Sequence, residues 1–294
     1  MYWNDKYAVP VAAFIDAPED PEKALSEGRE RLGRSREEAK ETPYADALIR
    51  SIKFIDDIDK DDFTWAPYQL VYDSPDKARG EELEADESIR TPLRKAILEA
   101  KSEFIVVSPY FVPLKSGTEK LAALSVSGIN VVVVTNSLAS TNHAIVHTGY
   151  APYRKELLEH GVKLYEIRSD KAVRGTDEWQ GENGSGGALH TKGFIVDREV
   201  LFVGSFNWDP RSAFINTELG VILYSPELAC PLAEGLDSQV GARTYQAFLD
   251  ENGKLRWRGE ENGEEVVLTK EPDTTWWDRF SVNMMRVLPM RGQL

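Results

Sequence analysis

Two short apolar runs, residues 193–196 and 200–203, flank a three-residue polar turn. Runs of this length, rich in Val, Ile, Leu and Phe, predict the two strands of a buried β-hairpin. The polar residues in the turn and before and after the two runs are more numerous than a stable buried hairpin needs. They contribute an imidazole, an ammonium, a hydroxyl, an amide and two carboxylates, from His190, Lys192, Asp197, Ser205, Asn207 and Glu218.

The hairpin is expected to gather four of these side chains at one end. Residues two apart on a strand share a face, so His190 and Lys192 are expected to point the same way. Ser205 and Asn207 have the same spacing after the returning strand and are expected to face the first pair. A phosphodiester resists attack because its oxygens are anionic, and these groups neutralise charge and supply a nucleophile. The pattern predicts phosphodiester chemistry.

The spacing H-x-K-x4-D at residues 190–197, followed by G-S-x-N, resembles the HKD motif of the phospholipase D superfamily. Further segments resemble the second half of bacterial cardiolipin synthases of the C type, and together they cover nearly the whole chain. These segments are residues 1–4, 8–10, 65–75, 108–113, 135–139, 147–154 and 288–294. The resemblance implies a glycerophospholipid substrate, with phosphatidylglycerol-type lipids and cardiolipin formation as the leading expectation.

Each candidate residue has an expected part in this chemistry. Neutral His190 attacks phosphorus and gives a phosphohistidine, which divides one difficult displacement into two easier ones. Lys192 supplies a positive charge, and Ser205 and Asn207 donate hydrogen bonds to the non-bridging oxygens. Glu218 lies where the family has a glutamate and is expected to hold the far ring nitrogen of His190.

Two further residues complete the candidate set. Asp197 belongs to the motif, although bracing the turn or pairing with a basic residue is the favoured interpretation. His147 resembles a position near the pocket of cardiolipin synthase-like proteins, which implies substrate binding together with Lys192, Ser205 and Asn207. We expect no cofactor and no metal, because the histidines lack metal-ligand spacing with cysteine or carboxylates.

The resemblance also implies that one motif is missing, because the family's active site uses two and its second histidine acts as general acid. His143, His147 and His160 are not followed by a lysine two residues later, so none replaces it. We therefore expect a natural short form, a split-gene partner or a trimmed product. The missing motif would come from a second copy of this chain or from a separate chain.

The chain is expected to contain a connecting segment, residues 1–62, and a phospholipase D-like domain, residues 63–294. The first segment includes a charged stretch, residues 16–42, which either forms a solvent-facing helix or stays disordered. After residue 65, predicted helices and strands alternate, which indicates an α/β fold with a mixed sheet covered by helices on both faces. The predicted helices are 88–101, 115–127, 147–160 and one from Ser225 towards Asp250; the predicted strands are 104–107, 130–135, 162–167 and the hairpin.

Composition limits the partners of the chain. Its 49 acidic residues outnumber 35 basic ones and give a net charge of −14, which argues against nucleic acid as substrate. The single cysteine, Cys230, fits a reducing compartment. No apolar run is long enough to span a bilayer, so we expect a cytoplasmic protein, peripheral at the inner face of the bacterial membrane.

The C-terminal region combines aromatic and basic residues at helical spacing. Trp276, Trp277, Phe280 and Met284 recur every three or four residues, with Arg279, Arg286 and Arg291 nearby. This pattern is typical of an amphipathic helix at a membrane interface, but it equally fits a helix that covers the core.

Three functions remain open from the sequence alone. The leading one is phosphatidyl transfer or hydrolysis of glycerophospholipids. The alternatives are a homodimeric phosphodiesterase or nuclease of the same superfamily, and a non-catalytic half-enzyme or lipid-binding subunit.

Overall fold

The computed structural model describes residues 17–40, 63–169, 189–261 and 263–285. The chain divides into two compact units, and the sheet and the candidate site belong to the unit formed by residues 64–175 and 182–294. Helix α1 (Pro21–Lys40) belongs to the other unit. Pro21 is its first residue, and the Lys23 amide donates to the Asp20 carboxylate, which caps the helix. The charged stretch is therefore helical and solvent-exposed over these residues.

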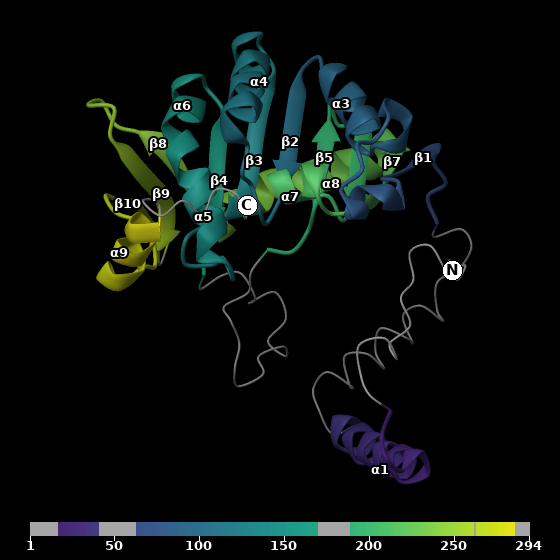
Figure 1. Cartoon of the computed structure of the whole chain (residues 1–294). Coiled ribbons are helices and arrows are strands. Elements are labelled where there is room, and N and C mark those ends of the chain that lie inside the picture. Colours follow the sequence, from purple (N-terminus) through teal and green to yellow (C-terminus); the bar gives the residue numbers. More distant parts are fainter. Residues whose placement is uncertain (1–16, 41–62, 170–188, 262, 286–294) are drawn as a thin grey trace. The chain divides into compact units, whose positions relative to one another are not determined.

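A ten-stranded mixed sheet is the framework of the larger unit, counted over the described residues (Figure 1). Its order is β1-β7-β6-β5-β2-β3-β4-β8-β9-β10, in which the pairs β2–β3 and β3–β4 are parallel and all other pairs are antiparallel. The strands are β1 Tyr68–Tyr72, β2 Glu103–Val107, β3 Asn130–Asn136, β4 Lys163–Ile167, β5 Gly193–Val196, β6 Val200–Gly204, β7 Leu219–Tyr224, β8 Thr244–Leu249, β9 Leu255–Glu261 and β10 Glu264–Leu268.

Helices cover both faces of this sheet (Figure 1). One face packs with α3 and α4 through Leu93 and Leu121, and the opposite face packs with α8 through Ala229 and Ala233. The predicted α/β fold with helices on both faces is confirmed. The helices of this unit are α3 Arg90–Leu98, α4 Leu114–Val126, α5 Ala144–Tyr150, α6 Arg154–Glu159, α7 Pro210–Phe214, α8 Pro226–Arg243 and α9 Trp276–Met285, with short 3-10 helices at Pro75–Arg79, Ala85–Glu87 and Ala151–Tyr153.

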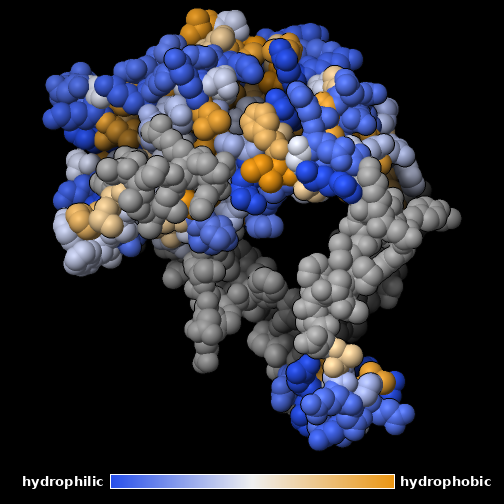
Figure 2. Space-filling view, viewed as in Figure 1, coloured by the Kyte–Doolittle hydropathy of each residue, from blue (hydrophilic) through white to orange (hydrophobic). Residues whose placement is uncertain are grey.

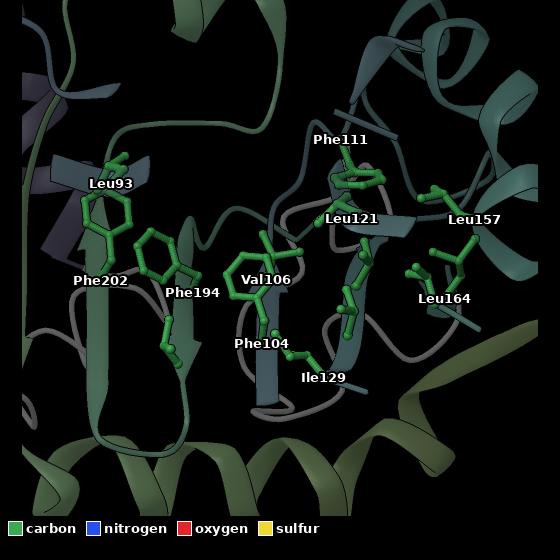
Figure 3. Packing of buried hydrophobic residues seen from close by; sticks show 14 of the residues in the cluster. Leu93, Phe104, Val106, Phe111, Leu121, Ile129, Leu157, Leu164, Phe194 and Phe202 are labelled. Atoms are coloured by element: carbon green, nitrogen blue, oxygen red, sulfur yellow. The ribbon is translucent and has the colours of Figure 1, made fainter. Parts of the chain in front are cut away.

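The predicted hairpin is formed by β5 and β6. Phe194 pairs with Phe202, and their stacked rings lie 5.0 Å apart in the core on the α3 side (Figure 3). Their neighbours Ile195 and Leu201 point to the opposite face and pack with α8. The turn residues 197 and 198 have φ of 52° and 58°, and Glu199 N donates to Val196 O over 3.0 Å. Two consecutive positive φ angles make this the type I′ turn that matches strand twist.

Two predicted helices differ in the structure. The helix expected over residues 147–160 is divided into α5, a 3-10 turn and α6, because Pro152 cannot continue an α-helical hydrogen-bond pattern. The helix after Ser225 begins as predicted, with the Ser225 side chain accepting from Leu228 N, but it ends at Arg243. Strands β8, β9 and β10 follow and extend the sheet, and the sequence analysis did not predict them.

Several sequence expectations lie outside the described residues: those on residues 1–4 and 8–10, and those on the tail after Met285. None of the described helices has the length and apolar character needed to cross a membrane.

Candidate active site

The candidate residues gather where β5 begins, β6 ends and β7 begins. These three ends lie together, because β6 pairs with both neighbours in antiparallel fashion. His190, Lys192 and Ser205 line one open cleft of about 520 Å³ there, together with Leu70, Leu219 and Val221. The predicted grouping of these three polar side chains is thus present in the structure.

A pair of glycines allows this close approach. Gly204, the glycine of G-S-x-N, pairs directly with Gly220 across β6 and β7. A Cβ atom at Gly204 would lie 2.6 Å from Leu219 O and 2.8 Å from the Phe202 ring. Real side chains do not tolerate such distances, so the motif requires glycine at this position.

His190 is exposed, and the chain just before it is anchored from β3. Asn136, which is buried at the end of that strand, accepts from Leu189 N over 3.0 Å and donates to Leu189 O over 3.3 Å. The Asn136 amide also donates to Pro109 O over 3.3 Å. The backbone that carries the imidazole is therefore fixed by a side chain more than fifty residues away, and sequence spacing alone did not indicate this role.

Lys192 lies half-buried two residues later. Its ammonium donates to His190 O over 2.9 Å. Burial lowers the pKa of Lys192, and the nearby carboxylates of Glu218 and Asp209 partly oppose this shift. The ammonium is therefore partly desolvated in the cleft that it shares with His190. An anionic phosphate in this cleft interacts with it more strongly than it would in water.

Ser205 and Glu218 are directly bonded. The Ser205 hydroxyl donates to the Glu218 carboxylate and accepts from Leu219 N over 3.0 Å. The sequence analysis expected Glu218 to hold His190, whereas in the structure this buried carboxylate orients the hydroxyl of Ser205.

A buried ion pair between Lys77 and Asp73 holds the backbone of Glu218. Lys77 donates to Asp73 over 2.6 Å and to Ser212 O over 2.8 Å. Asp73 also accepts from Glu218 N over 3.0 Å and from Ile89 N over 3.1 Å. The pair therefore joins β1, α7 and the start of β7. This ion pair was not predicted, because residues 65–75 were noted only for their resemblance to bacterial cardiolipin synthases.

Asn207 is buried beside this support. Its backbone N–H donates to Ser212 Oγ over 3.1 Å, and the next amide, Trp208 N, donates to Ser108 Oγ over 3.0 Å. Its side-chain Oδ1 has no hydrogen-bond partner among the described residues. Buried amide oxygens without partners are rare, so Oδ1 of Asn207 is an unusual feature next to the motif.

Asp197 lies at the opposite end of β5 from His190. Its carboxylate accepts from Lys101 N, Ser102 N and Glu103 N over 2.8–2.9 Å. Burial opposes the shift, but hydrogen bonds from Glu103, Ser102 and Lys101 hold the pKa of Asp197 below its usual value. The carboxylate therefore holds the segment before β2 rather than its own turn, and Asp197 does not line the cleft with His190.

His147 belongs to a separate buried cluster. It lies on α5 with Nε2 3.5 Å from Glu271, a distance longer than a normal hydrogen bond. Glu271 and Glu166 both accept hydrogen bonds from Arg154. Burial raises the pKa of Glu271, but the charges and hydrogen bonds of Arg154 and His147 outweigh this effect and hold that pKa well below its usual range. His147 does not line the cleft with His190, so the structure gives no support to its expected contact with substrate.

The two remaining histidines also lie apart from the cleft. The His143 ring packs edge-on against Tyr110, and His160 ends α6 with Nδ1 2.8 Å from Glu156 O. Gly161 follows with a φ of 85°, as expected for a helix stop. Within the described residues, no group of three or more His, Cys, Asp or Glu side chains is arranged to hold a metal ion.

A family model described as cardiolipin synthase, PLD-like domain, matches residues 93–239, which include the hairpin and every motif residue. The chain belongs to this PLD-like family. Cardiolipin synthase C of Escherichia coli (strain K12) is 37% identical over 233 residues, covering 78% of this chain and 49% of that protein. Cardiolipin synthase A of Proteus mirabilis is 28% identical over 166 residues, covering 56% of this chain and 30% of that protein. This PLD-like chain thus spans about half, or less, of the length of these relatives.

Among solved structures, Nuc from Salmonella typhimurium, a phospholipase D family member, is 20% identical with a TM-score of 0.45, and the match covers 63% of this chain and 99% of that one. NucT from Helicobacter pylori is 17% identical with a TM-score of 0.41, covering 59% of this chain and 95% of that one.

Proposed function

We propose that this chain carries half of a phosphatidyltransferase site that acts on glycerophospholipids through a phosphohistidine at His190. The observation that carries the proposal is the cleft shared by His190, Lys192 and Ser205, with Asn207 two residues after Ser205. The two cardiolipin synthase relatives support a phospholipid as substrate. Phosphatidylglycerol is the substrate class we favour.

The reaction has two steps. A ring nitrogen of His190 bonds to phosphorus while the bond from phosphorus to the leaving alcohol breaks, and an acid protonates the departing oxygen. The hydroxyl of a second lipid then attacks phosphorus, loses its proton to the same group and releases His190. If water replaces that hydroxyl, the product is the hydrolysed lipid. Lys192 and Asn207 stabilise the charge on the non-bridging oxygens. Glu218 keeps the hydroxyl of Ser205 in place through the hydrogen bond between them.

Among the described residues, no group in the cleft is placed to act as this acid, and we propose that a second HKD half supplies it. Its docking surface is the exposed part of the sheet face at the cleft, where Val203, Val221 and Leu70 form a row across β6, β7 and β1. Val203, Leu219 and Leu70 are 49%, 54% and 52% exposed. Large apolar side chains grouped on a sheet face favour burial by a partner. Residues 63–294 then form one half-enzyme, and residues 1–62 form the connecting segment.

Adding a separately expressed first half of a cardiolipin synthase C should raise the turnover of phosphatidylglycerol in mixed micelles about 10²–10⁴-fold, the usual contribution of a positioned acid. The products, cardiolipin or phosphatidic acid, distinguish transfer from hydrolysis. Val203→Glu should abolish the gain, because it places a charge in the docking surface at a residue that does not line the cleft. Val267→Glu is the matched control, since Val267 is equally exposed but lies on β10 at the other edge of the sheet.

Two outcomes would contradict this division of labour. Full activity of a monomeric chain would place the acid within the chain itself. Activity that falls on dilution, without any added first half, would assign the partner role to a second copy of the chain. Absence of phospholipid turnover with the first half present would overturn the proposed function.

We propose in addition that α9 contacts the membrane surface. Trp276 and Trp277 are 57% and 68% exposed, and with Phe280 they form one cluster of ring contacts 4.7–6.0 Å apart. Val282 faces inward and is buried. Exposed tryptophan on one face of a helix suits the interface of a bilayer.

The double variant Trp276→Ser, Trp277→Ser should lower binding of the chain to phosphatidylglycerol–phosphatidylethanolamine vesicles in a sedimentation assay. Each tryptophan lost from an interface removes a large apolar contact area, so we expect a decrease of about tenfold or more. Trp65→Ser removes a more exposed tryptophan from outside α9 and should have no effect. Equal losses in both variants would show that α9 has no special part in membrane contact.

A further inference from the structure

A second, deeper hollow lies on the opposite face of the sheet from the docking surface. It is a groove of about 910 Å³ between α3 and α4, hereafter the α3–α4 groove. Figure 2 shows hydrophobic residues at the surface between the hydrophilic outer sides of these helices. Its apolar lining includes Ile97, Leu98, Leu124, Phe194, Phe206 and Trp208.

The groove is apolar because its floor is the hydrophobic core itself. Phe194, Phe202 and Val106 form the floor along β5, β6 and β2, where Figure 3 shows them side by side. Arg94 and Lys120, charged side chains of the lining, are exposed, whereas Lys77 is buried and paired with Asp73. An apolar groove of this size is costly to leave in contact with water, at about 25 cal/mol per Å².

The groove extends to the same end of the sheet as the active site, although the two share no lining residue. Gly193 lines it and directly follows Lys192, and Phe206 lines it between Ser205 and Asn207. Asp209, which lines the groove as well, is close enough to Lys192 for its carboxylate to act on the pKa of that ammonium. The walls of the groove and the phosphate-binding residues are thus carried by the same short segments before β5 and after β6.

We propose that the α3–α4 groove holds an acyl chain of the phospholipid whose phosphodiester reacts at His190. This inference rests on the proposed function and adds a chain-binding subsite to it. An acyl chain is unbranched and apolar, which suits the floor formed by Phe194, Phe202 and Val106. The volume lies within the range of about 300–1,000 Å³ that is typical of small-molecule sites. The groove lies on the other face of the sheet from the surface assigned to the second half, so both are occupied together.

A photoreactive phosphatidylglycerol, with a diazirine near the end of one acyl chain, tests this subsite in the full-length chain. After irradiation in detergent micelles and digestion, we expect labelled peptides from α3, α4 and residues 205–214. Ala123→Trp should reduce this labelling, because Ala123 lines the groove from α4. Each methylene denied burial weakens binding about fourfold, so displacing two of them should lower labelling about tenfold or more.

Val126→Trp is the matched control, because Val126 lies on the same helix, is 70% exposed and does not line the groove. It should leave labelling unchanged. His190→Asn should also retain labelling, since it removes the chemistry and not the chain site. Label confined to other peptides such as α9, or equal labelling in Ala123→Trp and Val126→Trp, would overturn the inference.

Turnover separates a failure of this inference from a failure of the proposed function. With the first half present, Ala123→Trp should slow the turnover of long-chain phosphatidylglycerol and leave that of its deacylated glycerophosphodiester unchanged. Unchanged turnover of both substrates would reject the groove while leaving the phosphatidyltransferase intact. If His190→Asn still turned over both substrates, the proposed function would be rejected instead.

Discussion

His190→Asn should eliminate phospholipid turnover together with the acid-labile phosphoryl adduct on the enzyme. The imidazole is the only group in the cleft that bonds to phosphorus in the proposed mechanism, and asparagine keeps polarity and approximate size without nucleophilicity. Loss of the nucleophile in covalent enzymes costs about 10⁴-fold or more in rate. The adduct is measured by acid quench after incubation with phosphorus-labelled substrate and the first half.

Variants of the neighbouring residues should give a graded result. Lys192→Met and Asn207→Ala should each lower kcat by roughly 10²–10³-fold, the usual effect of one lost charge-stabilising donor. Thr191→Ala serves as the control, because Thr191 lies between His190 and Lys192, is exposed and has no assigned part. Retained turnover in well-folded His190→Asn would refute the nucleophile assignment. A loss in Asn207→Ala that appeared only as a lower Tm would make Asn207 structural.

The hairpin and the grouping of its polar residues could be predicted because both depend on local rules. Strand alternation set which residues of β5 and β6 reach each face, and the antiparallel return brought Ser205 back to His190 and Lys192. Asp197 is an exception, because its carboxylate accepts from the amides of residues 101–103, which are far away in the sequence, and not from its own turn.

The supports of the site could not be predicted, because they connect segments far apart in the sequence. Asn136 anchors the chain before His190 from the end of β3, and Asp73 holds the amide of Glu218 from β1. Neither contact leaves a periodic pattern in the sequence. His147 was expected near the pocket. Instead it is buried beside Glu271, which belongs to a region for which no secondary structure was predicted.

The strands β8–β10 were missed for a related reason. In β8 the buried residues Tyr245 and Ala247 alternate with partly exposed ones, but the segment contains few β-branched residues. It is a strand because β4 offers it an open edge, where Glu166 pairs with Tyr245. A partner strand that lies some eighty residues earlier decides its conformation, and local propensity does not.

Lys77→Met should give the largest loss of stability among the variants of the site region. Lys77 and Asp73 are both buried, and methionine keeps the volume of the lysine while removing its charge. Breaking a buried pair leaves the remaining charge uncompensated, which costs about 3–5 kcal/mol. Two backbone N–H groups, from Ile89 and Glu218, still donate to Asp73, so we expect a value near the lower end of this range.

Lys115→Met is the matched control, because Lys115 pairs with Glu119 over 3.9 Å in an exposed position on α4. A surface pair of this kind contributes about 0–1 kcal/mol. Urea unfolding of the full chain gives the free energy of unfolding for both variants. Since Asp73 also accepts from Glu218 N, Lys77→Met should weaken the Ser205–Glu218 contact and lower kcat as well as stability. Equal, small losses of stability in the two variants would mean that the buried pair does not hold the site together, and that Glu218 is positioned by β7 alone.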